Sequence, residues 1–105
     1  MTGEEFVQNC SIEKGRMLDI YFDKTKETLV GEQIKNLVAN GISERTVRSL
    51  IESVMNEVFY TMLLGLDGET SLGNAQMTYK LFDEDGNQLE DIESYAFDSF
   101  MAEDE

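Results

Sequence analysis

The chain contains no histidine, no proline and only one cysteine in 105 residues. Histidine is the commonest general base and the commonest metal ligand in proteins, so its absence excludes Ser-His and Cys-His catalysis and histidine-ligated zinc. The single cysteine, Cys10, excludes an intramolecular disulfide bond. Because Cys10 lies in an apolar helical pattern with no histidine to activate it, we expect a small buried side chain rather than a reactive thiol.

Long hydrophobic runs are also absent. The longest nearly apolar run, Phe59 to Leu66, is far shorter than the ~20 residues that a membrane-spanning helix needs. The first residues, Met1 to Phe6, lack the basic region and the apolar stretch of a signal peptide. We therefore expect a soluble, cytoplasmic protein that does not associate with membranes.

Basic residues are scarce in the second half of the chain. Residues 1–52 hold 9 Asp and Glu against 7 Lys and Arg, whereas residues 53–105 hold 13 against 1, Lys80. The two halves therefore carry net charges of −2 and −12, which make up the total of −14. Such a field repels nucleic acid and anionic membranes, and it attracts a basic protein or a cation.

The lack of proline favours helices, and apolar residues at three-and-four spacing predict two of them in the first half. The first runs from Phe6 to Phe22, as one bent helix or two short ones, and Thr2 and Glu5 form a capping-box pattern at its start. The second covers Thr28 to Ala39 and ends at Asn40-Gly41, where glycine fits the left-handed position after a helix.

The longest apolar pattern predicts a helix over residues 43–66, with Ser43 as its N-cap. Its apolar stripe comprises Val47, Leu50, Ile51, Val54, Met55, Val58, Phe59, Met62 and Leu66. We expect this helix to be the central element of the core. Val54 and Val58 would then be buried so deeply that an aspartate at either position unfolds the domain.

The pattern changes after Leu66. Residues Met77 to Phe82 alternate and are rich in strand formers, with either Thr70–Leu72 or Gln88–Leu89 as the pairing partner. Apolar residues from Ile92 to Met101 then indicate a short C-terminal helix, and residues 103–105 form a frayed tail.

The sequence as a whole predicts a mainly α (α+β) fold in a single domain, residues 1–105. Three to four helices are arranged around the long central helix 43–66, with a small antiparallel hairpin near 70–89 and a short C-terminal helix. No internal repeat or low-complexity linker divides the chain.

The acidic run from Asp83 to Asn87 invites comparison with a calcium loop. A helix-loop-helix calcium site needs glycine at loop position six and glutamate at position twelve. With Gly86 at position six, Leu81 falls at position one and Ile92 at position twelve, and neither is a ligand. We therefore interpret the run as a hairpin turn and predict no metal site.

Paired carboxylates for acid–base chemistry are the remaining catalytic option. Asp67 and Glu69 would have to meet the acidic run 83–85, and nothing in the sequence brings them together. The chain also lacks a nucleophile with a nearby base and a glycine loop that would hold a phosphate. We therefore expect a protein that is not an enzyme and has no cofactor.

Two strings, residues 59–68 (FYTMLLGLDG) and 79–87 (YKLFDEDGN), resemble those of small acidic bacterial proteins. Their organisation is similar to that of immunity proteins in bacterial toxin systems, and the resemblance covers residues 43–102. It implies a protein that neutralises a toxin by binding it, often with an acidic surface complementary to a basic nuclease.

The acidic half and the missing catalytic groups favour an inhibitor or escort of a basic protein. The residues expected to bind that partner are Tyr60, Asp67, Glu69, Asp83, Glu84, Asp85, Glu90, Asp91, Glu93 and Asp98. Two alternatives stay open. One is nucleic-acid mimicry, with carboxylates spaced like phosphates, and the other is a homo-oligomer with the helix Ser43–Leu66 as its seam.

Overall fold

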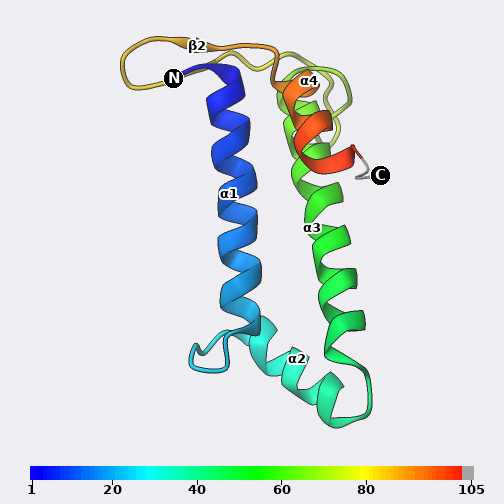
Figure 1. Ribbon diagram of the computed structural model, residues 1–105. Coiled ribbons are helices and arrows are strands. Elements are labelled where there is room, and N and C mark those ends of the chain that lie inside the picture. The colour runs from blue at the N-terminus through cyan, green and yellow to red at the C-terminus, as the bar shows by residue number, and fades with distance from the viewer. Residues whose placement is uncertain (103–105) are drawn as a thin grey trace. The chain divides into compact units, whose positions relative to one another are not determined.

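A computed structural model describes residues 1–102, so the predicted frayed tail lies outside the described residues. The elements in chain order are α1 (Gly3–Phe22), α2 (Leu29–Ala39), α3 (Glu44–Leu66), β1 (Leu81–Phe82), β2 (Gln88–Leu89), α4 (Ile92–Ala96) and the π-helical turn η1 (Phe97–Met101) (Figure 1). The predicted fold class is confirmed, because long helices dominate and the only sheet in the described residues is a two-stranded antiparallel hairpin.

The chain forms two compact units. Unit 1 comprises Met1–Ser11 and Asn56–Glu105, and unit 2 comprises Ile12–Met55. Unit 2 contains 7 acidic and 7 basic residues, whereas unit 1 contains 15 acidic residues and Lys80 alone. All of the net charge of −14 therefore belongs to unit 1. The single domain over residues 1–105 stays a prediction, because two compact units can still unfold as one cooperative domain.

Helix α1 begins at the predicted capping box. The amide of Glu5 donates to Thr2 Oγ1 at 3.1 Å, and the amide of Thr2 donates to Glu5 Oε1 at 2.8 Å. Two orphan amides of the first turn are thereby satisfied. The helix then continues without interruption to Phe22, so the single helix is the correct one of the two alternatives.

The ends of α2 and α3 also follow the sequence. Thr28 caps α2, since its Oγ1 accepts from the amide of Gly31 at 2.8 Å. Gly41 adopts φ of +95°, and the amide of Ile42 reaches back to the carbonyl of Leu37 at 3.1 Å, as in a Schellman motif. Ser43 caps α3 by accepting from the amide of Thr46 at 3.1 Å.

The hairpin is shorter than predicted. Of the two possible partners, Gln88–Leu89 is the correct one: Leu81 pairs with Leu89 and Phe82 with Gln88. Residues 77–80 form no strand, because the amide of Tyr79 donates to the carbonyl of Leu66 at 2.9 Å and holds this segment against the end of α3. Leu72, from the other proposed partner, bridges to Ala75 instead.

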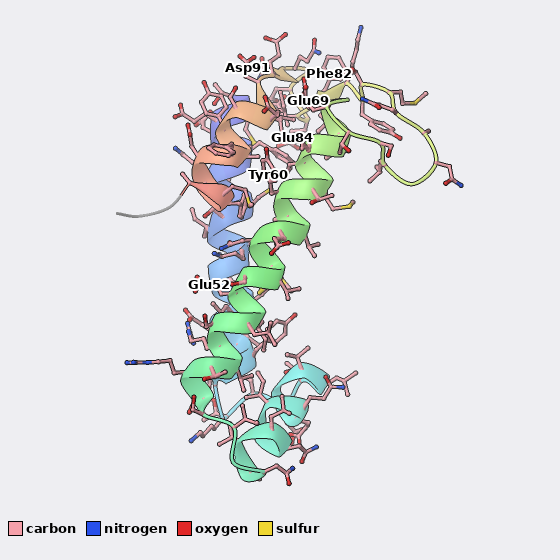
Figure 2. All side chains as sticks on the ribbon, turned by 90° about the vertical axis from the view of Figure 1, so that its right-hand side faces the viewer. Glu52, Tyr60, Glu69, Phe82, Glu84 and Asp91 are labelled. Carbon is pink, nitrogen blue, oxygen red and sulfur yellow. The ribbon has the colours of Figure 1, made fainter. Side chains whose placement is uncertain are left out.

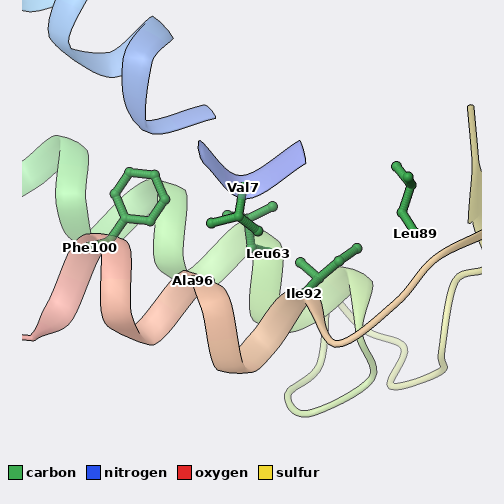
Figure 3. Packing of buried hydrophobic residues seen from close by; sticks show 6 residues of the cluster. All are labelled: Val7, Leu63, Leu89, Ile92, Ala96 and Phe100. Atoms are coloured by element: carbon green, nitrogen blue, oxygen red, sulfur yellow. The ribbon is translucent and has the colours of Figure 1, made fainter. Parts of the chain in front are cut away.

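The core of unit 1 joins residues that are far apart in the sequence. Its buried members are Val7, Leu63, Leu89, Ile92, Ala96 and Phe100 (Figure 3). The ring of Phe59 stacks on that of Phe100 with centroids 5.5 Å apart. Cys10 lies half-buried beside this core, and burial raises the pKa of its thiol, as expected for a packing residue.

Unit 2 is held by fewer apolar contacts. Leu18, Ile34 and Val47 are the only buried apolar side chains among its residues 12–55. The guanidinium of Arg48 donates to Asp19 at 3.0 Å and lies 5.1 Å from the centroid of the Phe22 ring. Exposed ion pairs of this kind contribute little to the free energy of unfolding. Unit 2 therefore has a small buried core and gains little stability from its ion pairs.

The burial expected along α3 is wrong in part. Val54 and Val58 are 50% and 54% exposed, so an aspartate at either position would lie in water and would not unfold the domain. Of the predicted stripe Val47 alone is buried, and Leu50 and Met62 are exposed as well, whereas the buried Leu63 lies outside that stripe. The physical reason is that helical periodicity identifies an apolar face, but it does not show whether another element packs along its whole length.

The contact between Gly3 and residue 90 gives a direct test of the packing in unit 1. A Cβ at Gly3 would collide with the backbone carbonyl of Glu90, whereas a Cβ at Gly15 would meet no described atom within 4 Å. We predict that Gly3→Ala lowers the free energy of unfolding by about 1–3 kcal/mol. Gly15→Ala, the control on the same helix, should raise it by about 0.5–1 kcal/mol. Urea denaturation measures both, and a Gly3→Ala variant as stable as wild type would refute this packing.

Candidate partner-binding surface

All ten residues predicted to bind a partner lie in unit 1. The exposed ones are Glu69, Glu84, Asp85, Glu90, Asp91 and Asp98, and the partly buried ones are Tyr60, Asp67, Asp83 and Glu93. Figure 2 shows Glu69, Glu84 and Asp91 at the end of unit 1 where α3 terminates. The structure therefore gathers several of these carboxylates at one end of the unit, although the sequence separates them.

Asp67 has a structural role within the fold. Its Oδ2 accepts from the backbone amide of Glu93 at 3.0 Å. Helix α4 has no side-chain cap of its own, because Asp91 at its start adopts the left-handed conformation with φ of 58° and makes no capping bond. Asp67 thus caps α4 from a distant part of the sequence and links it to the end of α3.

Asp83 also has a structural role within the fold. Its Oδ1 accepts from the amides of Asp85 at 3.0 Å and Asn87 at 2.8 Å, which closes the turn of the hairpin. Its Oδ2 accepts from the Met1 ammonium at 2.7 Å and from Asn87 Nδ2 at 3.0 Å. The ammonium and then the Asn87 side chain hold the pKa of Asp83 well below its ordinary range. This carboxylate stabilises the turn and is not free for a partner.

Tyr60 is partly buried and packs against the core of unit 1. Its ring meets the ring of Phe97 edge-on, with centroids 6.1 Å apart and an interplanar angle of 68°.

Seven predicted carboxylates have no ion pair among residues 1–102, namely Glu69, Glu84, Asp85, Glu90, Asp91, Glu93 and Asp98. These seven are the part of the predicted site that the fold leaves available.

Phe82 is a candidate that the sequence reasoning missed. It is 57% exposed, whereas its neighbour Leu81 packs against the core of unit 1. Adjacent strand residues point to opposite faces, so the alternation Leu81-Phe82 could have identified the outward ring. We call Phe82, Glu84 and Asp85 the hairpin surface. It combines an exposed aromatic ring with two carboxylates that lack ion pairs, and aromatic residues are enriched among those that anchor interfaces.

Neither a metal-binding cluster nor a membrane-spanning helix is found among residues 1–102. Among residues 1–102, no three acidic or cysteine side chains gather in a group that could hold a metal ion. No helix in that part of the chain is long and apolar enough to cross a bilayer. Known proteins add no assignment, because no protein family, curated protein or solved structure matches the chain. The similarity to immunity proteins therefore stays a prediction.

The contacts of Asp83 predict a specific dependence of stability on pH. Because its pKa is depressed in the folded state, its stabilisation is complete above the ordinary value of about 3.9 and is lost as pH falls through the lower folded value. The pKa of the Met1 ammonium is raised, mainly by its hydrogen bond to Asp83, so this pair also weakens when pH rises through the folded value of the ammonium.

We predict that Asp83→Asn is less stable than wild type near neutral pH and that the difference shrinks as pH falls from about 5 to about 2. Urea denaturation at a series of pH values measures this difference. An equal difference in the free energy of unfolding at every acidic pH would contradict the assignment.

Proposed function

We propose that this protein is a non-enzymatic cytoplasmic binding protein that inhibits or escorts a basic protein, as immunity-type partners do. The observation that carries the proposal is the set of seven carboxylates in unit 1 that have no ion pair among the described residues. A basic partner would supply the charges that this unit lacks.

The distribution of charge supports fast and selective association. Unit 1 has a net charge of −14 with Lys80 as its only basic side chain. Its negative electrostatic field therefore acts on a partner before any contact forms. Opposite potentials steer two proteins together and raise the association rate, whereas salt screens them over about 10 Å at 0.1 M. Binding through this unit should therefore weaken as ionic strength rises.

The hairpin surface offers an apolar contact to a partner in addition to the attraction between opposite charges. Phe82 projects a large apolar ring, and Glu84 and Asp85 follow it in the adjacent turn. A buried aromatic ring surrounded by charge-complementary contacts is a common arrangement at interface hot spots. The matching surface on a partner would be an apolar pocket bordered by lysine or arginine.

Binding is better supported than catalysis. The chain has no histidine, and burial raises the pKa of the Cys10 thiol, which disfavours the reactive thiolate. Two of the predicted carboxylates, Asp67 and Asp83, are used by the fold to cap a helix and to close a turn. Six of the seven available carboxylates are exposed on the surface, where they suit recognition of charge.

The test is capture from a lysate of the source organism on immobilised protein, with elution by rising salt. The interface variant is Glu84→Lys/Asp85→Lys, and Glu27→Lys/Glu44→Lys is a control with the same net charge of −10 but with its changes in unit 2. Wild type and the control should retain the same basic protein, the interface variant should lose it, and Phe82→Ala should bind it at least about tenfold more weakly.

The proposal fails if no basic protein is retained, or if the interface variant retains it as well as the control does. Release of the captured protein by duplex DNA of arbitrary sequence would instead indicate nucleic-acid mimicry. Circular dichroism of each variant checks that the helices are retained, so that lost binding is not mistaken for unfolding.

A further inference from the structure

The turn of the hairpin determines which backbone groups of β1 point away from β2. The amide of Asp83 donates to the carbonyl of Asn87 at 3.0 Å, so these two residues form a hydrogen-bonded pair. Hydrogen-bonded and non-hydrogen-bonded pairs alternate along an antiparallel ladder. The next pair, Phe82 with Gln88, is therefore of the non-hydrogen-bonded kind, and the amides and carbonyls of both residues point to the outer edges of the hairpin.

The outer edge of β1 has no hydrogen-bonding partner within the described part of the chain. Neither the amide nor the carbonyl of Phe82 takes part in a hydrogen bond among residues 1–102. The backbone groups of Lys80, two positions earlier, have no partner in that range either. Groups two positions apart in an extended chain point to the same side, so both residues belong to one edge. Both are also exposed.

The outer edge of β2 faces the start of α1 instead of solvent alone. Glu90 directly follows β2, and a Cβ at Gly3 would collide with its backbone carbonyl. Thr2 and Gly3 also line an open hollow together with Gln88 and Glu90. A further strand could not reach this edge without displacing α1. Of the two edges of the hairpin, that of β1 is therefore the one that the described residues leave open.

An unpaired strand edge is a template for a further strand, because an extended peptide can bond to its amides and carbonyls. The charges beside the edge favour one occupant. Glu84 and Asp85 directly follow β1, and neither has an ion pair among residues 1–102. A second copy would bring the charge of −14 of its own unit 1 against the same charge. A segment with lysine or arginine would instead complement the two carboxylates.

We infer that a basic partner binds by strand addition, in which an extended segment of that partner pairs with the edge Lys80–Phe82 and becomes the third strand of the sheet. This inference rests on the proposed function, because it assigns the way in which the basic partner is held. The ring of Phe82 projects from a face of the sheet, whereas the new hydrogen bonds lie in its plane. The ring and the edge are therefore used together.

The test uses the full chain and a capped peptide of about eight residues in which lysine and valine alternate. A peptide in which lysine and proline alternate carries the same charge, but proline cannot continue a ladder of hydrogen bonds. Nuclear magnetic resonance of the labelled protein at up to about 1 mM peptide measures binding and the hydrogen exchange of each amide. The lysine–valine peptide should slow the exchange of the Lys80 and Phe82 amides, and the lysine–proline peptide should not.

Two variants at one position separate the backbone from the charge. Lys80→Ala and Lys80→Pro remove the same charge, but only proline removes the amide from the edge. Lys80→Ala should bind the lysine–valine peptide more tightly than wild type, because a like charge is gone. Lys80→Pro should bind it at least about tenfold more weakly than Lys80→Ala does. The Lys80 amide has no bond among residues 1–102 to lose, and urea denaturation checks that both variants fold.

The outcomes distinguish this inference from the proposed function. Strand addition is overturned if the peptide does not bind, if it leaves the Phe82 amide of wild type unprotected, or if Lys80→Pro binds it as well as Lys80→Ala does. It is also overturned if rising protein concentration alone protects that amide, because a second copy then occupies the edge. The proposed function fails separately if Glu84→Lys/Asp85→Lys retains full affinity for the lysine–valine peptide.

Discussion

The packing of Val7, Leu63 and Ile92 holds unit 1 together against its own charge. These residues come from the start of α1, the end of α3 and the start of α4, so one apolar contact joins three separate segments. The free energy gained by burying apolar side chains does not depend on charge. It can therefore stabilise unit 1 despite the repulsion among its 15 acidic residues. The hairpin and its exposed carboxylates keep their places because Leu89 belongs to the same core.

Hydrogen bonds to two carboxylates stabilise unit 1 in addition to its apolar core. Asp67 caps α4, and Asp83 accepts hydrogen bonds from two backbone amides in the turn of the hairpin. These two carboxylates are thus used by the fold, and seven others in the predicted site have no ion pair among residues 1–102. Unit 2 differs from unit 1 in that it carries no net charge.

Local structure was predictable from the sequence to the extent that it depends on neighbouring residues. The capping box of Thr2 and Glu5 and the left-handed Gly41 are short-range features, and both are confirmed. The burial of Val54 was predicted wrongly, because periodicity indicates a face without showing what covers it. The role of Asp67 depends on an amide 26 positions away, which no local pattern reveals. Phe82, in contrast, was accessible from strand alternation.

The apolar core of unit 1 stabilises it against the repulsion among carboxylates that lack ion pairs. The most direct test is the free energy of unfolding, measured by urea denaturation at low protein concentration in increasing sodium chloride. Screening reduces repulsion between like charges, so the free energy of unfolding should rise with salt. A free energy of unfolding that falls as salt is added would mean instead that ion pairs, and not the apolar core alone, stabilise the fold.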